Sequence, residues 1–327
     1  MSQQEHQINK LIKRFYQGSV VEHNRLDHLH QWVLRIVAFL VVVLLALILF
    51  TLTKMAWPAL STFGLGFPFT NEWNPVTDQY GGLAFVYGTV ITSLLALFFA
   101  SPVSLGISLY CTQLCPRLLR NPLIFFVEIL AAIPSIVYGL WALFFLCPFI
   151  RDYIAPFFQE TLGLEEVIFF HGPSFGIGIL SASLILAIMV LPTICTISIE
   201  VFKTIPKDLA HAALALGATR WETIKIAVFK PGLKGVLGAN ILGLGRAFGE
   251  TMAVAMVIGN KADIDLSIFS AGATMASVLA NEYAEATTDL HTASLAYIGL
   301  VLFGVSFIIN IIAKLSLWSL DKQNEAR

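Results

Sequence analysis

Two charged residues in the middle of an apolar stretch are the first candidates for chemistry. Arg246 and Glu250 stand one helical turn apart inside the glycine-rich run 233–258. A charge at the centre of a membrane helix costs about 2.5–3.5 kcal/mol on insertion scales, so a helix that only packs would carry neither residue. An arginine guanidinium also offers an oxyanion two parallel hydrogen bonds. We therefore expect the pair to line a polar path, to act as a gate, or to bridge to a partner subunit.

The same spacing also allows a purely structural role. Residues at i and i+4 are neighbours on a helix, so Arg246 and Glu250 could neutralise each other, although Arg before Glu is the less favourable order. Small residues recur on the same stretch at a spacing of four residues, which predicts close helix packing. They are Ala239 with Gly243, and Gly245 with Gly249 and Ala253.

A polar and basic segment, residues 203–232, separates two apolar runs and is expected to form two short helices. Pro206 suits the first turn of the first helix, and Asp208 there complements the positive end of the helix dipole. Gly217 can adopt the left-handed conformation that ends this helix. On spacing alone, the segment is equally well an ordinary helical hairpin between membrane spans.

The second helix of this segment has a start signal and a stop signal. Thr219 and Glu222 form a T-x-x-E capping box, in which each side chain accepts a hydrogen bond from the backbone N–H of the other residue. Pro231 and Gly232 are expected to end the helix, because proline interrupts the hydrogen bonds of a helix interior.

The elements that must position these residues are membrane helices. Of 327 residues, 57% are hydrophobic and 13% are charged, which is too few charges for the surface of a soluble protein of this size. Six runs approach the roughly 20 apolar residues that a spanning helix requires. They are 33–53, 84–110, 123–147, 174–199, 233–258 and 292–317. Three of them are expected to kink at an internal proline, namely Pro102, Pro134 and Pro192.

Lysine and arginine fall mainly in alternate segments, and this asymmetry predicts the orientation. The basic set comprises the N-terminal segment, the loop at 117–120, residues 203–232 and the C-terminal tail, whereas the opposite, acidic loops contain only Lys54, Arg151 and Lys261. The positive-inside rule places both termini and residues 203–232 in the cytoplasm. The expected segments are a cytoplasmic N-terminal segment at 1–32, a first transmembrane helix at 33–53, a periplasmic loop at 54–83 and a cytoplasmic tail at 319–327.

Several other chemistries are excluded by what the sequence lacks. There is no G-x-x-x-x-G-K-[ST] motif, so any ATP hydrolysis must be done by a separate subunit. No Ser-His-Asp set, zinc-protease helix or haem motif is present, which argues against an enzyme. The four cysteines lie in or beside apolar runs and are expected to pack, and no cofactor is expected. His23, His28 and His30 lack the fourth ligand that would complete a zinc site.

Residues 206–232 resemble the cytoplasmic loop of ABC-importer permeases. The family pattern is E-A-A, then Gly four residues after the second Ala, then a hydrophobic stretch and a Pro. This sequence departs from the pattern at His211, where the family usually has Glu, and matches it at Ala212, Ala213, Gly217 and Pro231. We expect the contact with an ATPase to involve Asp208, His211, Ala212, Ala213, Gly217 and Arg220.

Two further stretches narrow the resemblance. AAIPSIVYGLWAL at 131–143 and GRAFGETMAVAMVIGN at 245–260 are similar to the PstC-type phosphate permeases, and the resemblance covers roughly 80–318. It implies an all-α polytopic membrane protein with the type I ABC-importer permease fold. In this interpretation residues 84–318 form the permease core and residues 203–232 the cytoplasmic coupling loop.

The resemblance also implies partners and a function. Such permeases form a heterodimer with a PstA-like permease in the bacterial inner membrane, bind a PstB-like ATPase dimer, and receive phosphate from a PstS-like periplasmic binding protein. We therefore expect half of an ATP-driven path for inorganic phosphate, with Arg246 and Glu250 involved in transport, in contact with lipid and not with nucleic acid. The alternative substrates are molybdate and sulfate. The alternative classes are an ion-coupled secondary transporter and a membrane scaffold or sensor.

Overall fold

The computed structural model describes the backbone of residues 2–325 and the side chains of residues 28, 30–116 and 118–315. The chain divides into two units, Met1–Lys54 and Met55–Arg327. The first unit is the N-terminal part of helix α1 (Ser2–Phe63). Nearly all its described apolar side chains are exposed, so lipid is the environment that can cover them.

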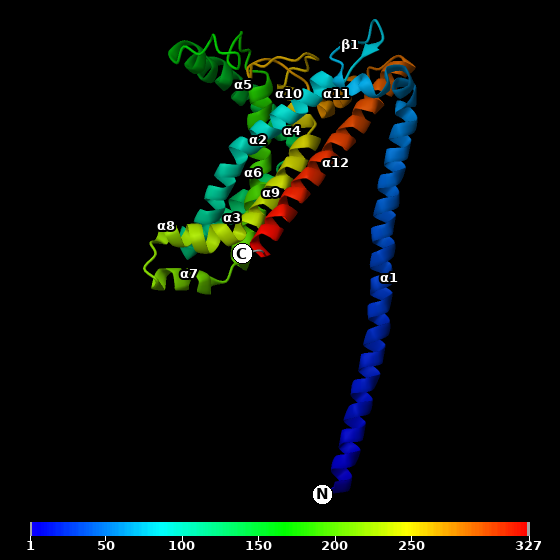
Figure 1. Cartoon of the computed structure of the whole chain (residues 1–327), viewed down its shortest axis with the longest axis vertical. Coiled ribbons are helices and arrows are strands. Elements are labelled where there is room, and N and C mark those ends of the chain that lie inside the picture. The colour runs from blue at the N-terminus through cyan, green and yellow to red at the C-terminus, as the bar shows by residue number, and fades with distance from the viewer. Residues whose placement is uncertain (1, 326–327) are drawn as a thin grey trace. The chain divides into compact units, whose positions relative to one another are not determined.

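The second unit begins with the last turns of α1, so the predicted loop at 54–83 is helical up to Phe63. A short 3₁₀ helix, η1 (Gly64–Phe69), follows. Strands β1 (Trp73–Asn74) and β2 (Gln79–Tyr80) then form an antiparallel hairpin, which Figure 1 shows in cyan. The hairpin shares an apolar cluster with α11 (Met275–Glu282) and with the first turns of α12 (Asp289–Glu325).

A buried polar contact fastens this hairpin to α12. His291 Nε2 lies 3.1 Å from Glu282 Oε2, and Trp73 Nε1 donates to the same oxygen at 2.9 Å. The ring of Tyr80 stacks on the His291 imidazole. One carboxylate therefore satisfies the buried His291 and the half-buried Trp73, which keeps the cost of taking these groups out of water low.

The centre of the second unit is formed by α2 (Leu83–Leu109), α6 (Ile179–Thr204) and α9 (Lys230–Gly249). Two serines of α2 donate hydrogen bonds to carbonyls of α6. Ser104 Oγ bonds Leu191 O at 3.0 Å, and Ser108 Oγ bonds Cys195 O at 3.1 Å. Such interhelical bonds stabilise helix packing in membranes, where few other polar partners exist. These bonds hold the middle of α6, the helix that contributes Thr193 to the candidate site.

The third predicted span, 123–147, is not a continuous helix. Helix α3 (Arg117–Ala132) ends at Ile133, whose ψ of 129° is extended, and α4 (Ser135–Trp141) begins after Pro134. A residue before proline disfavours the helical conformation, and proline has no N–H to donate to the preceding turn. The predicted kink is therefore a full break.

The fifth predicted span, 233–258, is also interrupted. Helix α9 ends at Gly249, Glu250 is extended with φ −71° and ψ 126°, and α10 (Met252–Val257) follows. No proline lies at this break, but glycine weakens helices at Gly245 and Gly249. Helix α10 packs against α4, so the two short helices that follow the breaks are neighbours (Figure 1).

Five helical segments within the described residues are long and apolar enough to cross a membrane. They are His30–Phe69, Leu83–Leu114, Ser135–Thr161, Ile179–Thr204 and Asp289–Leu315. The predicted span missing from these five, 233–258, corresponds to the interrupted segment formed by α9 and α10. The predicted orientation of the termini stays a prediction.

Wide π-helical turns precede three prolines that the helices accommodate. η3 (Ala142–Leu146), η4 (Ile150–Ile154) and η6 (Ile224–Phe229) each end two residues before a proline. A proline ring crowds the carbonyl four residues earlier and cannot donate a hydrogen bond, and the wider turn relieves both problems. Two further π turns are η2 (Tyr110–Leu114), which ends α2, and η5 (Phe157–Thr161), while α5 (Cys147–Phe149) lies between η3 and η4.

The prediction that Pro231 and Gly232 end a helix is therefore wrong. Pro231 lies in the first turn of α9, directly after η6. The helix runs without interruption from α8 (Arg220–Thr223) through η6 and α9 to Gly249.

Candidate translocation site and coupling segment

Arg246 lies in the last turn of α9 and reaches across to α6. Its Nη1 donates a hydrogen bond to Thr193 Oγ1 at 3.2 Å. The Arg246 side chain is exposed. A guanidinium has five N–H donors, and among the described residues the bond to Thr193 uses one of them. The remaining donors can bind an anion or a partner subunit.

Glu250 occupies the break between α9 and α10 and is half-buried. None of the hydrogen bonds or ion pairs between described side chains involves its carboxylate. Because Glu250 is extended, it has left the helical spacing that would bring it over Arg246. The structure therefore shows Arg246 bonded to Thr193, and not the self-neutralised pair that the i, i+4 spacing allows.

The surroundings of the break are formed by the other interrupted span. A methyl group placed on Gly139 of α4 would lie 3.1 Å from Ala253 Cα and 2.6 Å from Met256 Sδ, both on α10. The Tyr138 hydroxyl donates to Leu130 O at 2.8 Å, which joins α4 back to α3 across the first break. Close packing at Gly139 thus fixes α10, and with it the position of Glu250.

The small residues of α9 face in two directions. Ala239 is fully buried, and a methyl group on Gly243 would lie within 3 Å of Val190 and Ile194 of α6. A methyl group on Gly245 or Gly249 would meet no atom within 4 Å. The predicted close packing is therefore present on one face, while a second face beside Arg246 is open.

The predicted first helix of the 203–232 segment is α7 (Lys207–Ala215), with Asp208 in its first turn. Its end is a Schellman motif. Gly217 has φ +87° and its N–H donates to Leu214 O, while Ala218 N–H donates to Ala213 O at 3.1 Å. The predicted left-handed stop at Gly217 is confirmed.

The predicted capping box begins α8, and Arg220 is its first helical residue. The Glu222 backbone N–H donates to Thr219 Oγ1 at 3.3 Å, and the Thr219 N–H donates to Glu222 Oε2 at 2.8 Å. The bonds from the Thr219 N–H and hydroxyl hold the pKa of the Glu222 carboxyl below its ordinary value. Both caps are made by residues within five positions of each other.

The α7–α8 segment exposes large apolar side chains beside its polar and charged ones. No residue of α7 is buried, Ala213 is half-buried, and Asp208, His211, Ala212 and Arg220 are exposed. Two large apolar side chains of the segment are mostly exposed, Leu216 at 89% and Trp221 at 68%. Exposed apolar groups clustered on one segment are typical of a docking surface.

The structure does not bring the two groups of predicted residues together. Arg246 and Glu250 lie at the break, whereas the residues predicted to contact an ATPase lie on α7 and α8 (Figure 1). The continuous helix from Arg220 to Gly249 joins them over roughly 45 Å, at 1.5 Å per residue. A displacement of α8 can therefore reach the break through one element.

Two residues near these sites were missed in the sequence. The only sequence signal for Thr193, the partner of Arg246, is a weak one: it is a hydroxyl residue directly after the mid-span Pro192. Arg120 of α3 borders a pocket together with His211 of α7, and no sequence pattern connects these two distant residues.

Residues 103–317 match the family model of the binding-protein-dependent transport system inner membrane component. The chain belongs to this family. Its relatives include the phosphate transport system permease protein PstC of Mesorhizobium japonicum, which is 45% identical over 89% of this chain and 90% of the relative. The PstC of Pasteurella multocida is 41% identical, over 92% and 96% of the two chains. A probable PstC of Methanocaldococcus jannaschii is 36% identical, over 84% and 88%.

The fold of this permease is that of a solved ABC importer. A chain of the MetNI methionine ABC transporter, in an inward-facing crystal form, superposes with a TM-score of 0.53 over 72% of this chain and 94% of the other, at 18% identity. The predicted fold class, an all-α ABC-importer permease embedded in a membrane, is confirmed. Because the relatives are permease subunits, the prediction that this chain is a transport subunit and not an enzyme is also confirmed.

Proposed function

We propose that this permease forms half of the path by which inorganic phosphate crosses the bacterial inner membrane, driven by ATP hydrolysis in a separate subunit. The observation that carries the proposal is the 45% identity, over nine-tenths of its length, to a PstC phosphate permease. An intramembrane arginine with unused N–H donors is the chemistry that an oxyanion path needs.

In this proposal Arg246 and Glu250 recognise different parts of the ion. The guanidinium donates to phosphate oxygens, which carry the negative charge. The Glu250 carboxylate accepts the hydrogen bond of the phosphate P–OH group, because an ionised carboxylate can only accept. Sulfate and molybdate carry no such proton near neutral pH and would meet the carboxylate with like-charge repulsion. The pair therefore favours phosphate over the alternative oxyanions.

The coupling segment, α7 with α8, docks on the ATPase. This assignment is supported by the exposed Leu216 and Trp221 and by the absence of any buried residue in α7. Asp208, His211, Ala212, Ala213, Gly217 and Arg220 contribute the contact surface. His211 replaces the acidic residue usual at its position, so the polar contact made there is one that a neutral or positive side chain can give.

Movement of the ATPase then reaches the path through the helix from Arg220 to Gly249. Glu250 provides the hinge, because its extended backbone carries no helical hydrogen bond to the next turn. Helix α4 follows α10 through the close contact at Gly139. The path alternates between inward-open and outward-open states as these elements rock together.

The remaining partners occupy other surfaces. A PstA-like permease packs against the open glycine face beside Arg246, where Gly245 and Gly249 allow close approach. A PstB-like ATPase dimer binds on the cytoplasmic side, and a PstS-like binding protein docks on the acidic loops of the periplasmic side. Both termini are cytoplasmic in this arrangement, as the distribution of Lys and Arg predicts.

The test is phosphate uptake into proteoliposomes that contain this permease with its partner permease and ATPase. Binding protein is supplied outside and ATP inside. The proposal expects accumulation of phosphate that requires both ATP and binding protein and that excess sulfate or molybdate does not compete away. ATP-dependent uptake of a different anion would correct the substrate, and uptake that ignores ATP depletion would favour a secondary transporter.

A further inference from the structure

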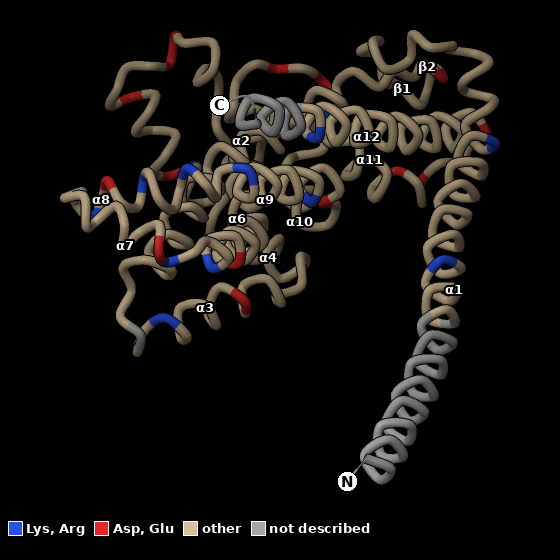
Figure 2. Tube along the Cα trace, turned by 60° about the horizontal axis from the view of Figure 1, so that its bottom comes forward, with Lys and Arg blue, Asp and Glu red and all other residues tan. Residues whose placement is uncertain are grey.

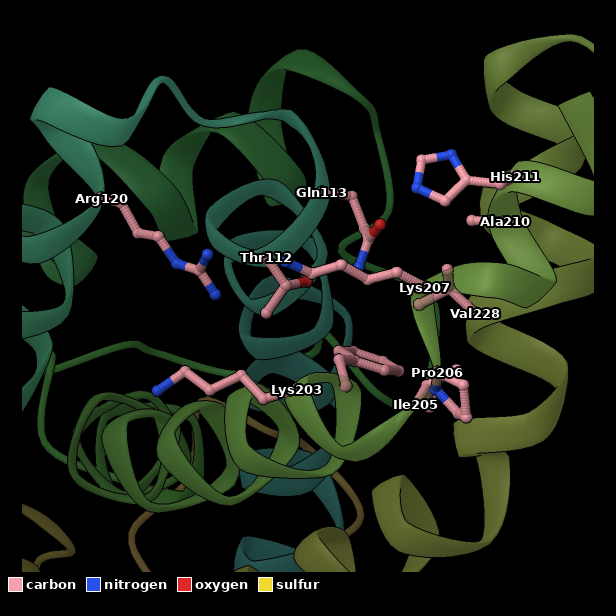
Figure 3. A pocket seen from close by; sticks show the side chains of 11 residues that line it. Thr112, Gln113, Arg120, Lys203, Ile205, Pro206, Lys207, Ala210, His211 and Val228 are labelled. Atoms are coloured by element: carbon pink, nitrogen blue, oxygen red, sulfur yellow. The ribbon is translucent and has the colours of Figure 1, made fainter.

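A pocket of about 370 Å³ lies at the α7 end of the second unit, away from the break in α9–α10. Figure 3 shows it between η2, α3, the end of α6 and the beginning of α7. These elements form two stretches, η2 with α3 and α6 with α7, which are distant from each other in the sequence and meet only in the folded chain. The volume is more than ten times the roughly 30 Å³ that one water occupies in the liquid, so the pocket can hold a solute.

Among the described residues, four basic side chains and no acidic one line the pocket. Arg120 comes from α3, Lys203 from α6, and Lys207 and His211 from α7. Figure 3 shows Arg120 and Lys207 reaching toward each other from opposite sides of the pocket. Figure 2 shows blue Lys and Arg positions on α3, α7, α8 and α9.

Little within the chain compensates these charges. Lys203 pairs with the exposed Glu200 at 2.7 Å. Among the described residues, no hydrogen bond or ion pair involves the side chain of Arg120, Lys207 or His211. Two unpaired cations aimed into one cavity repel each other, and a bound anion would reverse that repulsion.

Of the two described neutral polar residues that line the pocket, Gln113 suits the same ligand and Thr112 does not contribute a donor. The Thr112 hydroxyl donates to Ser108 O at 2.8 Å, so its hydrogen is not available to a ligand. The Gln113 amide has no described hydrogen-bond partner and can donate to an oxyanion. A guanidinium, an ammonium and an amide together form the set of donors that binds a phosphate group.

We propose that this pocket is a binding site for a phosphate group, separate from the translocation site at Arg246. The ligand is either free inorganic phosphate or the headgroup of an anionic phospholipid, because both present the same oxygens. Resting on the proposed function, in which α7 is the coupling helix, a bound phosphate ties α7 to α3 and restrains the movement that drives uptake. Occupancy therefore lowers the uptake rate.

The test uses the permease assembled with its partner permease and ATPase in nanodiscs, without ATP or binding protein. One arm measures equilibrium binding of radioactive inorganic phosphate in neutral-lipid nanodiscs. The other arm measures retention of phosphatidylglycerol by native mass spectrometry in mixed-lipid nanodiscs. Each arm compares Arg120→Gln, Lys207→Gln and the double variant with Arg120→Lys, which retains the charge. Lys314→Gln is the matched control, because Lys314 is an exposed cation outside the pocket.

Each single Gln variant is expected to weaken binding about tenfold, and the double variant to abolish it, since each removes one charge-assisted hydrogen bond. Arg120→Lys and Lys314→Gln are expected to bind as the wild type does, and Arg246→Gln, which alters only the translocation site, is expected to leave the binding that depends on Arg120 and Lys207 unchanged. Loss in the first arm identifies free phosphate as the ligand, and loss in the second arm identifies the lipid headgroup. Absence of both kinds of binding, or equal binding by the double variant, would overturn the proposal.

Uptake measured on the same assemblies separates this inference from the proposed function. Wild-type phosphate uptake without either kind of binding would reject the pocket and leave the transport function standing. Binding that depends on Arg120 and Lys207 in an assembly that does not transport phosphate would support the pocket and count against the proposed function.

Discussion

The coupling segment and the interrupted spans reach their shapes by opposite routes. Helix α7 ends in a Schellman motif at Gly217, and α8 begins in the capping box of Thr219 and Glu222, so both boundaries depend on adjacent residues. The break at Glu250 has no such cap. It is held by packing between α10 and α4, which leaves no room for a Cβ at Gly139, more than a hundred positions away in the sequence.

This difference suits the two roles proposed for the regions. A surface that must dock on another protein benefits from being shaped before docking, because ordering costs are then lower. A hinge inside the membrane must be able to change its backbone conformation. Packing contacts between helices can be exchanged during such a change without breaking a helix cap. Substitutions can therefore be chosen that distinguish a locally encoded boundary from one imposed by distant contacts.

The largest effect is expected from removing the charge at the break. Arg246→Gln should lower phosphate uptake at least about 10- to 100-fold, because each charge-assisted hydrogen bond to the ion contributes about 1.5–3 kcal/mol. Assembly with the partner subunits should be unchanged. Uptake in proteoliposomes and size-exclusion chromatography of the complex measure these outcomes.

Arg151→Gln is the matched control, because Arg151 is an exposed arginine that already pairs with Asp152 at 2.7 Å. It should transport at the wild-type rate. An Arg246→Gln variant that assembles and transports normally would remove Arg246 from the mechanism.

A pair of glycines gives the sharpest contrast between the regions. Gly139→Ala should lower the free energy of unfolding by about 1–3 kcal/mol through overpacking against α10. Gly217→Ala should cost about 1–2 kcal/mol, because φ is +87° there and a methyl group meets no atom within 4 Å. Thermal unfolding of the purified permease measures both changes.

Substitution by asparagine should be milder than alanine at one site and more destabilising than alanine at the other. Asn tolerates the left-handed conformation, so Gly217→Asn should be milder than Gly217→Ala. The larger and polar Asn should be worse than Ala at Gly139. If Asn is the milder substitution at both positions, the packing explanation for Gly139 is wrong.

The smallest expected effect is a pH dependence at the start of α8. The folded pKa of Glu222 is lowered by the Thr219 hydrogen bonds, so its contribution to helix stability is complete above the ordinary glutamate pKa. It is lost as the pH falls through the lowered folded value. Amide hydrogen exchange at residues 220–222, corrected for intrinsic rates, should rise on acidification below about pH 4.5.

Glu222→Gln provides the control for this titration. Glutamine can accept the same backbone hydrogen bond in a capping box but has no proton to gain. Exchange in this variant should not change with pH in the same window. Equal acid sensitivity in both proteins would locate the titrating group elsewhere.

The sequence could predict the boundaries that adjacent residues form, but not those that depend on distant contacts. The end of α7 at Gly217 and the capping box at Thr219 were predictable, because the residues that form each boundary lie within five positions of one another. That Arg246 and Glu250 stand in an apolar run is visible in the sequence, and the role expected of them from the cost of such charges stays a prediction. The partner Thr193 was not predictable, because it belongs to a different helix.

Two errors have the same physical origin. The run 123–147 was predicted as one span with a kink at Pro134, and 233–258 as one span, because hydropathy measures composition and does not detect a break within an apolar run. Pro231 was predicted to end a helix because the rule for proline assumes a regular α-helical turn before it. The wide turn at Ile224–Phe229 removes that assumption. In both cases, whether the helix breaks or continues depends on how the backbone N–H and C=O groups are satisfied in the folded chain.

The central claim is that the coupling segment transmits ATP hydrolysis to the break, and Gly217→Asp tests it most directly. ATP hydrolysis and phosphate uptake should be measured in the same proteoliposomes, beside Gly217→Asn as the uncharged control of equal shape. Gly217 faces open space but has φ +87°, so Asp and Asn meet the same backbone requirement and differ mainly in the added charge. The account predicts that the inserted Asp variant hydrolyses ATP but loses uptake, while Asn retains both. Normal uptake per ATP hydrolysed by the Asp variant would contradict the claim.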